Sequence, residues 1–265
     1  MDLGLTDSVI IVTGGSSGIG LATVELLLAE GACVATCGRD VDRLALSLAA
    51  AGGRYGDRLI AMTADVTNAD DVADLVGSAV ERWGRVDGLV NNAGQSRMST
   101  FATTSDDDWR AEFELKFFGL LHAVRAAEPH LRSSESGAIV NIGAVLARQP
   151  EGRLVATSAA RAGVLNLSKS LATELAPDIR VNSVLLGLVD TGQWKRRYEL
   201  ADGESASGQT YDEWCAELAA DRGVVLGRLG TASEVAPTVA LLLSPMSGYT
   251  TGTTIEIAGG VSRSV

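Results

Sequence analysis

The sequence predicts an α/β protein built on one doubly wound parallel sheet of about seven strands, with helices on both faces. Short apolar runs typical of buried strands alternate with helix-length amphipathic segments along all 265 residues. This alternation indicates parallel βαβ units with right-handed crossovers. Because no linker or internal repeat interrupts the pattern, residues 1–265 are expected to form a single domain.

The strand-like runs are apolar or β-branched and are bounded by turn residues. Strands are expected at 9–13, 32–37, 59–64, 88–91, 138–142, 180–186 and 254–257. Amphipathic periodicity predicts helices near 19–30, 40–50, 70–84, 106–132, 155–176 and 232–244.

Residues 192–225 depart from this alternation. They are polar, with Trp194, Tyr198, Tyr211 and Trp214 interleaved, and they follow the sixth strand. Ligands bind at the carboxyl ends of the strands in such sheets, so this insertion is predicted to be a substrate lid. The alternative is a surface helical hairpin packed by its own aromatic residues.

Composition narrows the classes of partner. The net charge of −11 argues against nucleic acid or an anionic membrane surface. No apolar run reaches the ~18–20 residues that span a bilayer, and no signal peptide is recognisable, which predicts a cytoplasmic protein. Cys33 and Cys37 fall in a strand and are expected to be buried, and the pattern predicts no metal site.

A glycine-rich turn joins the first strand to the first helix. Gly14 suits a tight turn, Gly18 lets the backbone approach a pyrophosphate, and Gly20 allows close packing of helix on strand. The helix N-terminus then offers free N–H groups to phosphates. The arrangement is typical of a Rossmann-type dinucleotide site.

Motifs along the whole chain resemble those of the classical short-chain dehydrogenases/reductases. Residues 13–20 resemble the TGxxxGIG signature, residues 91–94 the NNAG motif, and Asp65-Val66 the adenine-contacting pair. Residues 180–182, with Gly187 and Thr191, resemble RVNxxxPGxxxT, except that Leu186 replaces the proline. Residues 227–230, 251–252 and 257–260 resemble the C-terminal elements, in the expected order.

The turn, this resemblance and the charge near the second strand together predict the dinucleotide-binding residues. They are Gly14, Ser16, Ser17, Gly18, Ile19, Gly20, Arg39, Asp65, Val66, Asn92, Ala93, Gly94, Arg161, Gly187, Val189 and Thr191. NADP(H) is expected rather than NAD(H), because the position that holds an acid in NAD-type sites is Gly38, and Arg39 can pair with a 2′-phosphate. Asp40 is expected to cap the next helix.

The resemblance also locates four catalytic positions, and all four are substituted. Catalysis in the family uses an asparagine, a serine, a tyrosine and a lysine. The corresponding positions here hold Lys116, Ala144, Thr157 and Arg161. A shifted alignment does not restore the tyrosine, since the chain has none between Tyr55 and Tyr198.

These substitutions remove the usual acid–base chemistry but leave cofactor binding intact. An aliphatic hydroxyl is a far weaker acid than a phenol. Arg161 can still donate to ribose hydroxyls. Lys116 is either a solvated surface lysine or a cation in the pocket. Tyr198 or Tyr211 from the lid, Lys116, and Ser158 are the candidate replacement donors.

Three functions therefore stay open. The first is an oxidoreductase with an atypical active site, which acts with NADP(H) on an unidentified carbonyl, alcohol or activated double bond. The second is a catalytically inactive dinucleotide-binding scaffold, sensor or partner subunit. The third is lyase or isomerase chemistry, with Arg161 and Lys116 stabilising an oxyanion. The resemblance further implies a homotetramer or homodimer that pairs helices 106–132 and 155–176.

Overall fold

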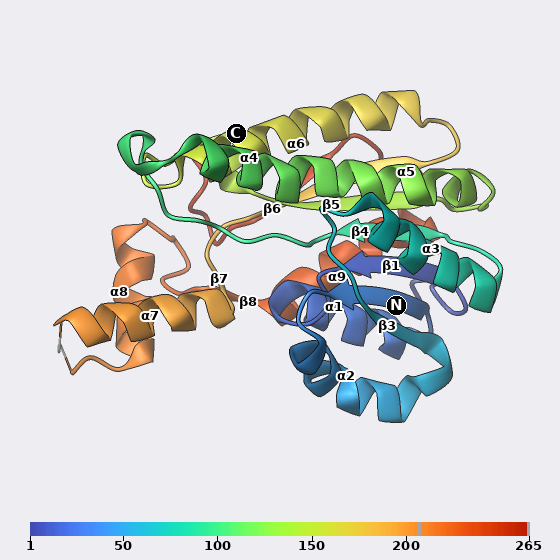
Figure 1. The fold of residues 1–265 in the computed structure, drawn as a ribbon, viewed down its shortest axis with the longest axis horizontal. Helices are drawn as coiled ribbons and strands as arrows, with labels where there is room; N and C mark the ends of the chain where they lie inside the picture. The colour runs from blue at the N-terminus through green and yellow to red at the C-terminus, as the bar shows by residue number, and fades with distance from the viewer. Residues whose placement is uncertain (206–207, 264–265) are drawn as a thin grey trace.

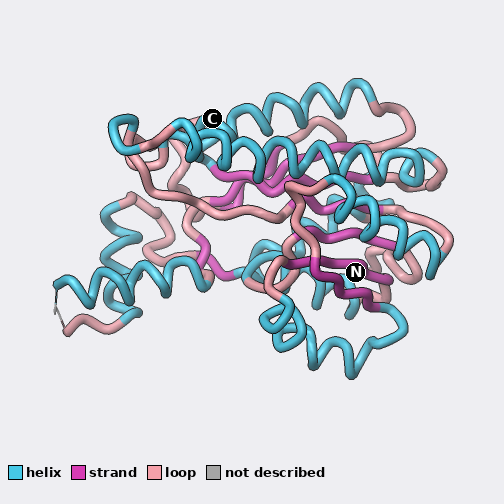
Figure 2. Tube along the Cα trace, in the orientation of Figure 1, coloured by secondary structure: helices cyan, strands magenta, loops and turns pink. Residues whose placement is uncertain are grey.

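The computed structural model describes residues 1–205 and 208–263, and it contains the predicted parallel sheet between two layers of helices (Figure 2). The sheet has seven strands in the order β3-β2-β1-β4-β5-β6-β9. Their bounds are β1 Val9–Thr13, β2 Cys33–Gly38, β3 Leu59–Thr63, β4 Gly88–Asn91, β5 Ala138–Ala144, β6 Arg180–Leu186 and β9 Thr254–Ile257. The strand order reverses between β1 and β4, and ligands bind at such a switch point.

Helices cover both faces of the sheet (Figure 1). One face carries α1 (Gly18–Ala29), α2 (Val41–Tyr55) and α9 (Ala232–Leu243). The other carries α3 (Ala69–Trp83), α5 (Gly119–Arg132) and α6 (Val155–Glu174).

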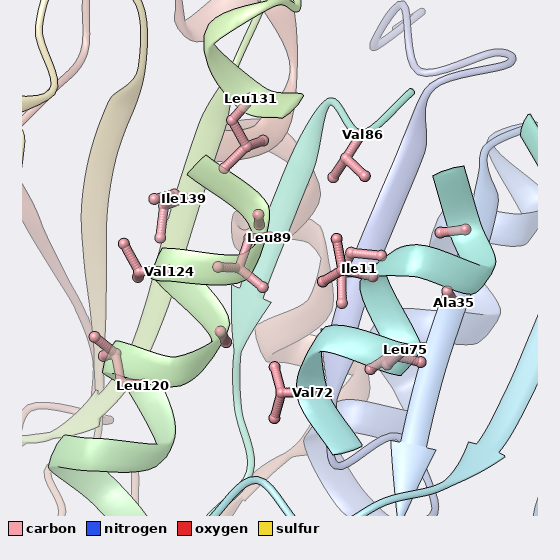
Figure 3. Packing of buried hydrophobic residues seen from close by; sticks show 14 of the residues in the cluster. Ile11, Ala35, Val72, Leu75, Val86, Leu89, Leu120, Val124, Leu131 and Ile139 are labelled. Carbon is pink, nitrogen blue, oxygen red and sulfur yellow. The ribbon is translucent and has the colours of Figure 1, made fainter. Parts of the chain in front are cut away.

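Alternate residues of β1 serve the two resulting cores. Ile11 joins the core under α3 and α5, with Leu75 and Leu89 (Figure 3), whereas Ile10 joins the core under α1 and α9. Because the strands of a parallel sheet are buried on both faces, they read as continuous apolar runs. Cys33 and Cys37 lie in the first of these cores, as predicted.

Two predicted helices differ from the observed ones. The helix expected at 106–132 is interrupted, because α4 (Asp106–Phe113) passes through a π-helical segment, Glu114–Phe118, before α5 begins. The spacing of apolar residues along the sequence gives no sign of a single π-helical turn within a longer helix. The helix expected at 40–50 continues to Tyr55, because Ala51 extends its buried face by one more turn. Gly52 and Gly53 face open space and contribute no packing.

The segment 192–225 forms two helices, α7 (Gly192–Ser205) and α8 (Tyr211–Asp221), which project beside β7 and β8 (Figure 1). Residues 206 and 207 of this predicted lid lie outside the described residues. Trp194, Tyr198, Tyr211 and Trp214 pack together, with ring centroids 5.4–6.3 Å apart. The two helices are thus held by their own aromatic residues, as the hairpin alternative expects, and a lid role stays a prediction.

A small two-stranded parallel sheet, which the sequence did not predict, anchors this segment. It pairs β7 (Val189–Asp190) with β8 (Gly230–Thr231). Within the residues that the structure describes, no helix combines the length and apolarity needed to cross a membrane.

The core between β4 and α5 predicts a clear stability difference between two leucines. Leu89 is fully buried and Leu46 is 81% exposed. Leu89→Ala is expected to lower the free energy of unfolding by about 2–5 kcal/mol, because it leaves a cavity, whereas Leu46→Ala changes it by less than about 0.5 kcal/mol. Denaturant unfolding without added ligand measures both values. Equal effects of the two substitutions would contradict the assigned core.

Candidate active site

The site begins where β1 and β4 end side by side at the switch point. The hydroxyl of Thr13 accepts hydrogen bonds from the backbone N–H groups of Asn92 and Ala93, at 3.0 and 3.1 Å. The Asn92 side-chain amide donates in turn to the carbonyls of Thr13 and Gly14, at 2.9 and 3.1 Å. These contacts fix the glycine-rich turn against the residues that follow β4.

The turn itself depends on glycine at two positions. Gly14 has a φ of +74°, in the region that disfavours side chains. At Gly20, a Cβ atom would lie 2.2 Å from the Gly14 carbonyl oxygen. Because Gly20 is buried, a side chain there could not turn away from this oxygen, and the turn would have to change shape.

The turn opens into a cavity of about 420 Å³. Most of the predicted dinucleotide-binding residues line it: Gly14, Ser16, Ser17, Gly18, Ile19, Arg39, Val66, Asn92, Ala93, Gly94, Arg161, Gly187, Val189 and Thr191. Gly20 and Asp65 are not among the lining residues. The Asp65 carboxylate instead accepts bonds from the backbone and hydroxyl of Thr67, at 3.0 and 2.8 Å.

Two arginines lie where β2 reaches the cavity. Arg39 and Arg43 both line it, and Asp40 accepts from the Arg43 backbone at 2.9 Å, so it caps α2 as predicted. A Cβ atom on Gly38 would come within 3.0 Å of the Ser16 Oγ. Arg43 was not predicted from the sequence. Its position in the first turn of α2, directly after the cap, was the available signal that it lies near Arg39.

A buried carboxylate, Glu112, contacts two of the four positions that the family resemblance locates. Its Oε2 accepts from the Lys116 Nζ at 2.6 Å and from the Thr157 Oγ1 at 2.5 Å. All three residues are at most 7% exposed. We call Glu112, Lys116 and Thr157 the carboxylate cluster. The sequence analysis missed Glu112, whose only signal was its i,i+4 spacing to Lys116.

Lys116 is a pocket residue and not a solvated lysine. It lies in the π-helical segment and lines the cavity. Burial lowers the pKa of its ammonium to about 8, against the opposing effect of Glu112 and with a smaller contribution from Arg161. A lysine with this pKa exists in both protonation states near neutral pH.

The other substituted positions have distinct surroundings. Ala144, at the end of β5, presents only a methyl group to the cavity. Thr157 is fully buried and does not line the cavity, since its hydroxyl donates to Glu112. Arg161 lines the cavity and donates to the Ile142 carbonyl at 3.4 Å, while its buried Nε has no hydrogen-bond partner among the described residues.

The other candidate proton donors are already engaged. Tyr198 donates to the Gln209 carbonyl at 2.5 Å. Tyr211 donates to Asp190 at 2.5 Å, and burial together with this bond raises its pKa. The Ser158 hydroxyl accepts from the Glu151 backbone. Lys116 is thus the candidate that lines the cavity and also has a pKa near neutral pH, at about 8.

Helix α7 closes one side of the cavity. The Ser96 carbonyl, in the loop after β4, accepts from Gln193 Nε2 at 2.7 Å and from Arg197 Nη2 at 3.3 Å. Beyond α8, Arg222 forms an ion pair with Glu151, in the loop before α6. These contacts connect both helices of the insertion to the loops that flank the carboxylate cluster.

Comparison with known proteins identifies the family. The model of the short chain dehydrogenases matches residues 8–201. A 3-oxoacyl-(acyl-carrier-protein) reductase from Chlamydia pneumoniae is 32% identical over 263 residues, which cover 99% of this chain and all of that protein. The chain therefore belongs to the short-chain dehydrogenase/reductase family of oxidoreductases, as its motifs indicated.

Solved structures give a more specific likeness. A short chain oxidoreductase from Pseudomonas aeruginosa, described as containing an atypical catalytic center, is 48% identical. Its apo form has a TM-score of 0.92 and covers 98% of this chain and 99% of that one, and it was also solved with NADPH bound. L-Sorbose reductase from Gluconobacter frateurii, solved with NADPH and L-sorbose, is 29% identical with a TM-score of 0.95 over the full length of both chains.

Proposed function

We propose that this protein is an NADP(H)-dependent oxidoreductase that acts on a carbonyl, alcohol or activated double bond, with Lys116 as its proton-transfer group. The observation that carries the proposal is the carboxylate cluster, which holds a lysine of lowered pKa against the cavity. An inactive scaffold has no need of such a group. Lyase or isomerase chemistry would not need the dinucleotide-binding turn that the chain retains.

The residues present fit NADP(H). Ser16, Ser17 and Gly18 offer backbone N–H groups at the start of α1 for the diphosphate. Arg39 and Arg43 suit the 2′-phosphate, since no acid lines that end of the cavity. The unpartnered Arg161 Nε suits a hydroxyl of the nicotinamide ribose. The NADPH complexes of the Pseudomonas oxidoreductase and of L-sorbose reductase support this choice.

Lys116 would replace the family's tyrosine as acid and base. The bound cofactor supplies the hydride chemistry. In reduction, the Lys116 ammonium gives a proton from Nζ to the substrate oxygen; in oxidation, the neutral amine accepts it. General acid–base groups work best with a pKa near the operating pH, which the value of about 8 satisfies.

The remaining cluster residues would position that lysine. Glu112 holds the Nζ atom, and Thr157 fixes the carboxylate by donating its hydroxyl. Ala144 supplies no donor, so polarisation of the substrate oxygen falls to Lys116 and Arg161. Thr157, although it occupies the tyrosine position, is thus a positioning residue. We also propose that 192–225 is the substrate lid. We further propose that the helices of residues 106–132 (α4 and α5) and 155–176 (α6) pair in a homodimer or homotetramer, as in the family.

Cofactor choice can be tested by titration with NADPH and NADH. Arg39→Gln is expected to weaken NADPH binding by roughly 10-fold or more, because it removes a charge-assisted pair, and to leave NADH binding unchanged. Arg54→Gln, in the following helix α2 and away from the cavity, is the control. Intrinsic fluorescence and thermal stability measure both ligands. Equal wild-type affinities for the two would contradict the NADP(H) preference, and binding of neither would overturn the oxidoreductase.

Proton transfer can be tested with para-nitrobenzaldehyde, an electron-poor aldehyde. Lys116→Met is expected to lower kcat by about 10²–10⁴-fold without changing NADPH affinity, whereas Lys195→Met is expected to behave as wild type. Because reduction needs the ammonium form, the wild-type rate should fall as the pH rises through about 8. Glu112→Gln should move this fall to lower pH, because Glu112 raises the Lys116 pKa.

The outcome that contradicts this assignment is a Lys116→Met variant that keeps the wild-type rate and pH profile while still binding NADPH. In that case another group transfers the proton, although the cofactor site itself would stand.

A further inference from the structure

We propose that the substrate carries an anionic group, a carboxylate or phosphate, and that Arg197 of α7 binds it. The proposal rests on the proposed function, because it names the class of substrate for the same cavity. Seven basic residues line it and one acid, Glu151, although the chain as a whole has a net charge of −11. The excess of positive charge is therefore local.

Several of these cations already have a partner. Lys116 pairs with Glu112, and Arg222 pairs with Glu151. Arg39 and Arg43 are assigned to the cofactor. Arg161, Arg196 and Arg197 remain, and among the side chains that the structure describes, those of residues 1–200 and 208–263, none of the three forms an ion pair with a carboxylate. Arg161 is taken by the ribose in the proposed function, so the two arginines of α7 are left without an anion.

Arg197 has the geometry of a preorganised anion-binding group. Its guanidinium lies over the Trp194 ring, 4.6 Å from the centroid, and its Nη2 donates to the Ser96 carbonyl at 3.3 Å. This is its one hydrogen bond among the described residues, so most of its five N–H donors are unused. Stacking fixes the planar fork, which matches the two oxygens of a carboxylate or phosphate.

Arg197 and Lys116 line the same cavity of about 420 Å³, and a chain of contacts connects them. Arg197 holds Ser96, and the next backbone N–H, that of Arg97, donates to the Thr157 hydroxyl at 3.4 Å. Thr157 in turn donates to Glu112, which holds Lys116. One substrate in this cavity can therefore place its anionic group at Arg197 and its reacting oxygen at Lys116. Burial lowers the pKa of Arg197, Arg222 nearby adds to this effect and Glu151 opposes it, so a bound anion would further relieve an unfavourable burial of charge.

A matched pair of ligands tests the proposal by binding rather than by turnover. The probes are para-formylbenzoate and its methyl ester, titrated calorimetrically into protein saturated with NADP⁺, so that no reduction occurs. The acid is expected to bind roughly 10- to 100-fold more tightly than the ester, because only the acid forms charge-assisted bonds. Arg197→Gln should reduce this preference to less than about 3-fold without changing NADP⁺ affinity, and Arg197→Lys should keep part of it.

Lys195→Gln is the matched control, since it removes one charge from the same helix at an exposed residue that does not line the cavity. This variant should keep the full preference. The proposal is overturned if the ester binds as tightly as the acid, if Arg197→Gln keeps the preference, or if Arg197→Gln weakens NADP⁺ instead. Failure of NADP⁺ to bind overturns the proposed function alone, because the same pair of ligands titrated into the protein without cofactor still tests Arg197.

Discussion

The candidate active site depends on one buried ion pair, in which the Glu112 carboxylate holds the Lys116 ammonium at 2.6 Å. Removing two charges from water is costly, and the Thr157 hydroxyl offsets part of that cost with a second hydrogen bond to the same oxygen. The π-helical turn between α4 and α5 lies at this point and carries Lys116 to the cavity. A pair that costs stability in this way is more readily explained by chemistry than by folding.

In the proposed function, the same cluster takes over the chemistry of the four catalytic positions that are substituted here. The usual phenol and its partner lysine lie on one helix, α6. Here the titratable group is Lys116, in the segment between α4 and α5. Helix α6 contributes the hydroxyl of Thr157 and the guanidinium of Arg161. The dinucleotide-binding turn needs no change, because its shape depends on Gly14, Gly20 and Asn92, which contact one another and not the cluster.

The sheet, its helices and most of the residues that line the cavity could be predicted from the sequence, because apolar periodicity and glycine spacing report directly on strands and turns. It located Lys116 and Arg161 but left the environment of Lys116 open. Glu112 was missed because a carboxylate four residues before a lysine is the usual pattern of an exposed helix face, and only packing shows that this pair is buried. Arg197 was missed for a similar reason, since its contact with Ser96 joins segments about 100 residues apart.

The central claim, a lysine that titrates near neutral pH, can be measured directly because the chain has only three lysines: Lys116, Lys169 and Lys195. Protein labelled with ¹³C at lysine Cε gives three side-chain signals by NMR, assigned with Lys169→Arg and Lys195→Arg variants. The account predicts that the Lys116 signal titrates at about pH 8, well below the ordinary lysine value of about 10.4. If all three signals titrate near the ordinary value, Lys116 is not the tuned proton-transfer group, and the account is wrong.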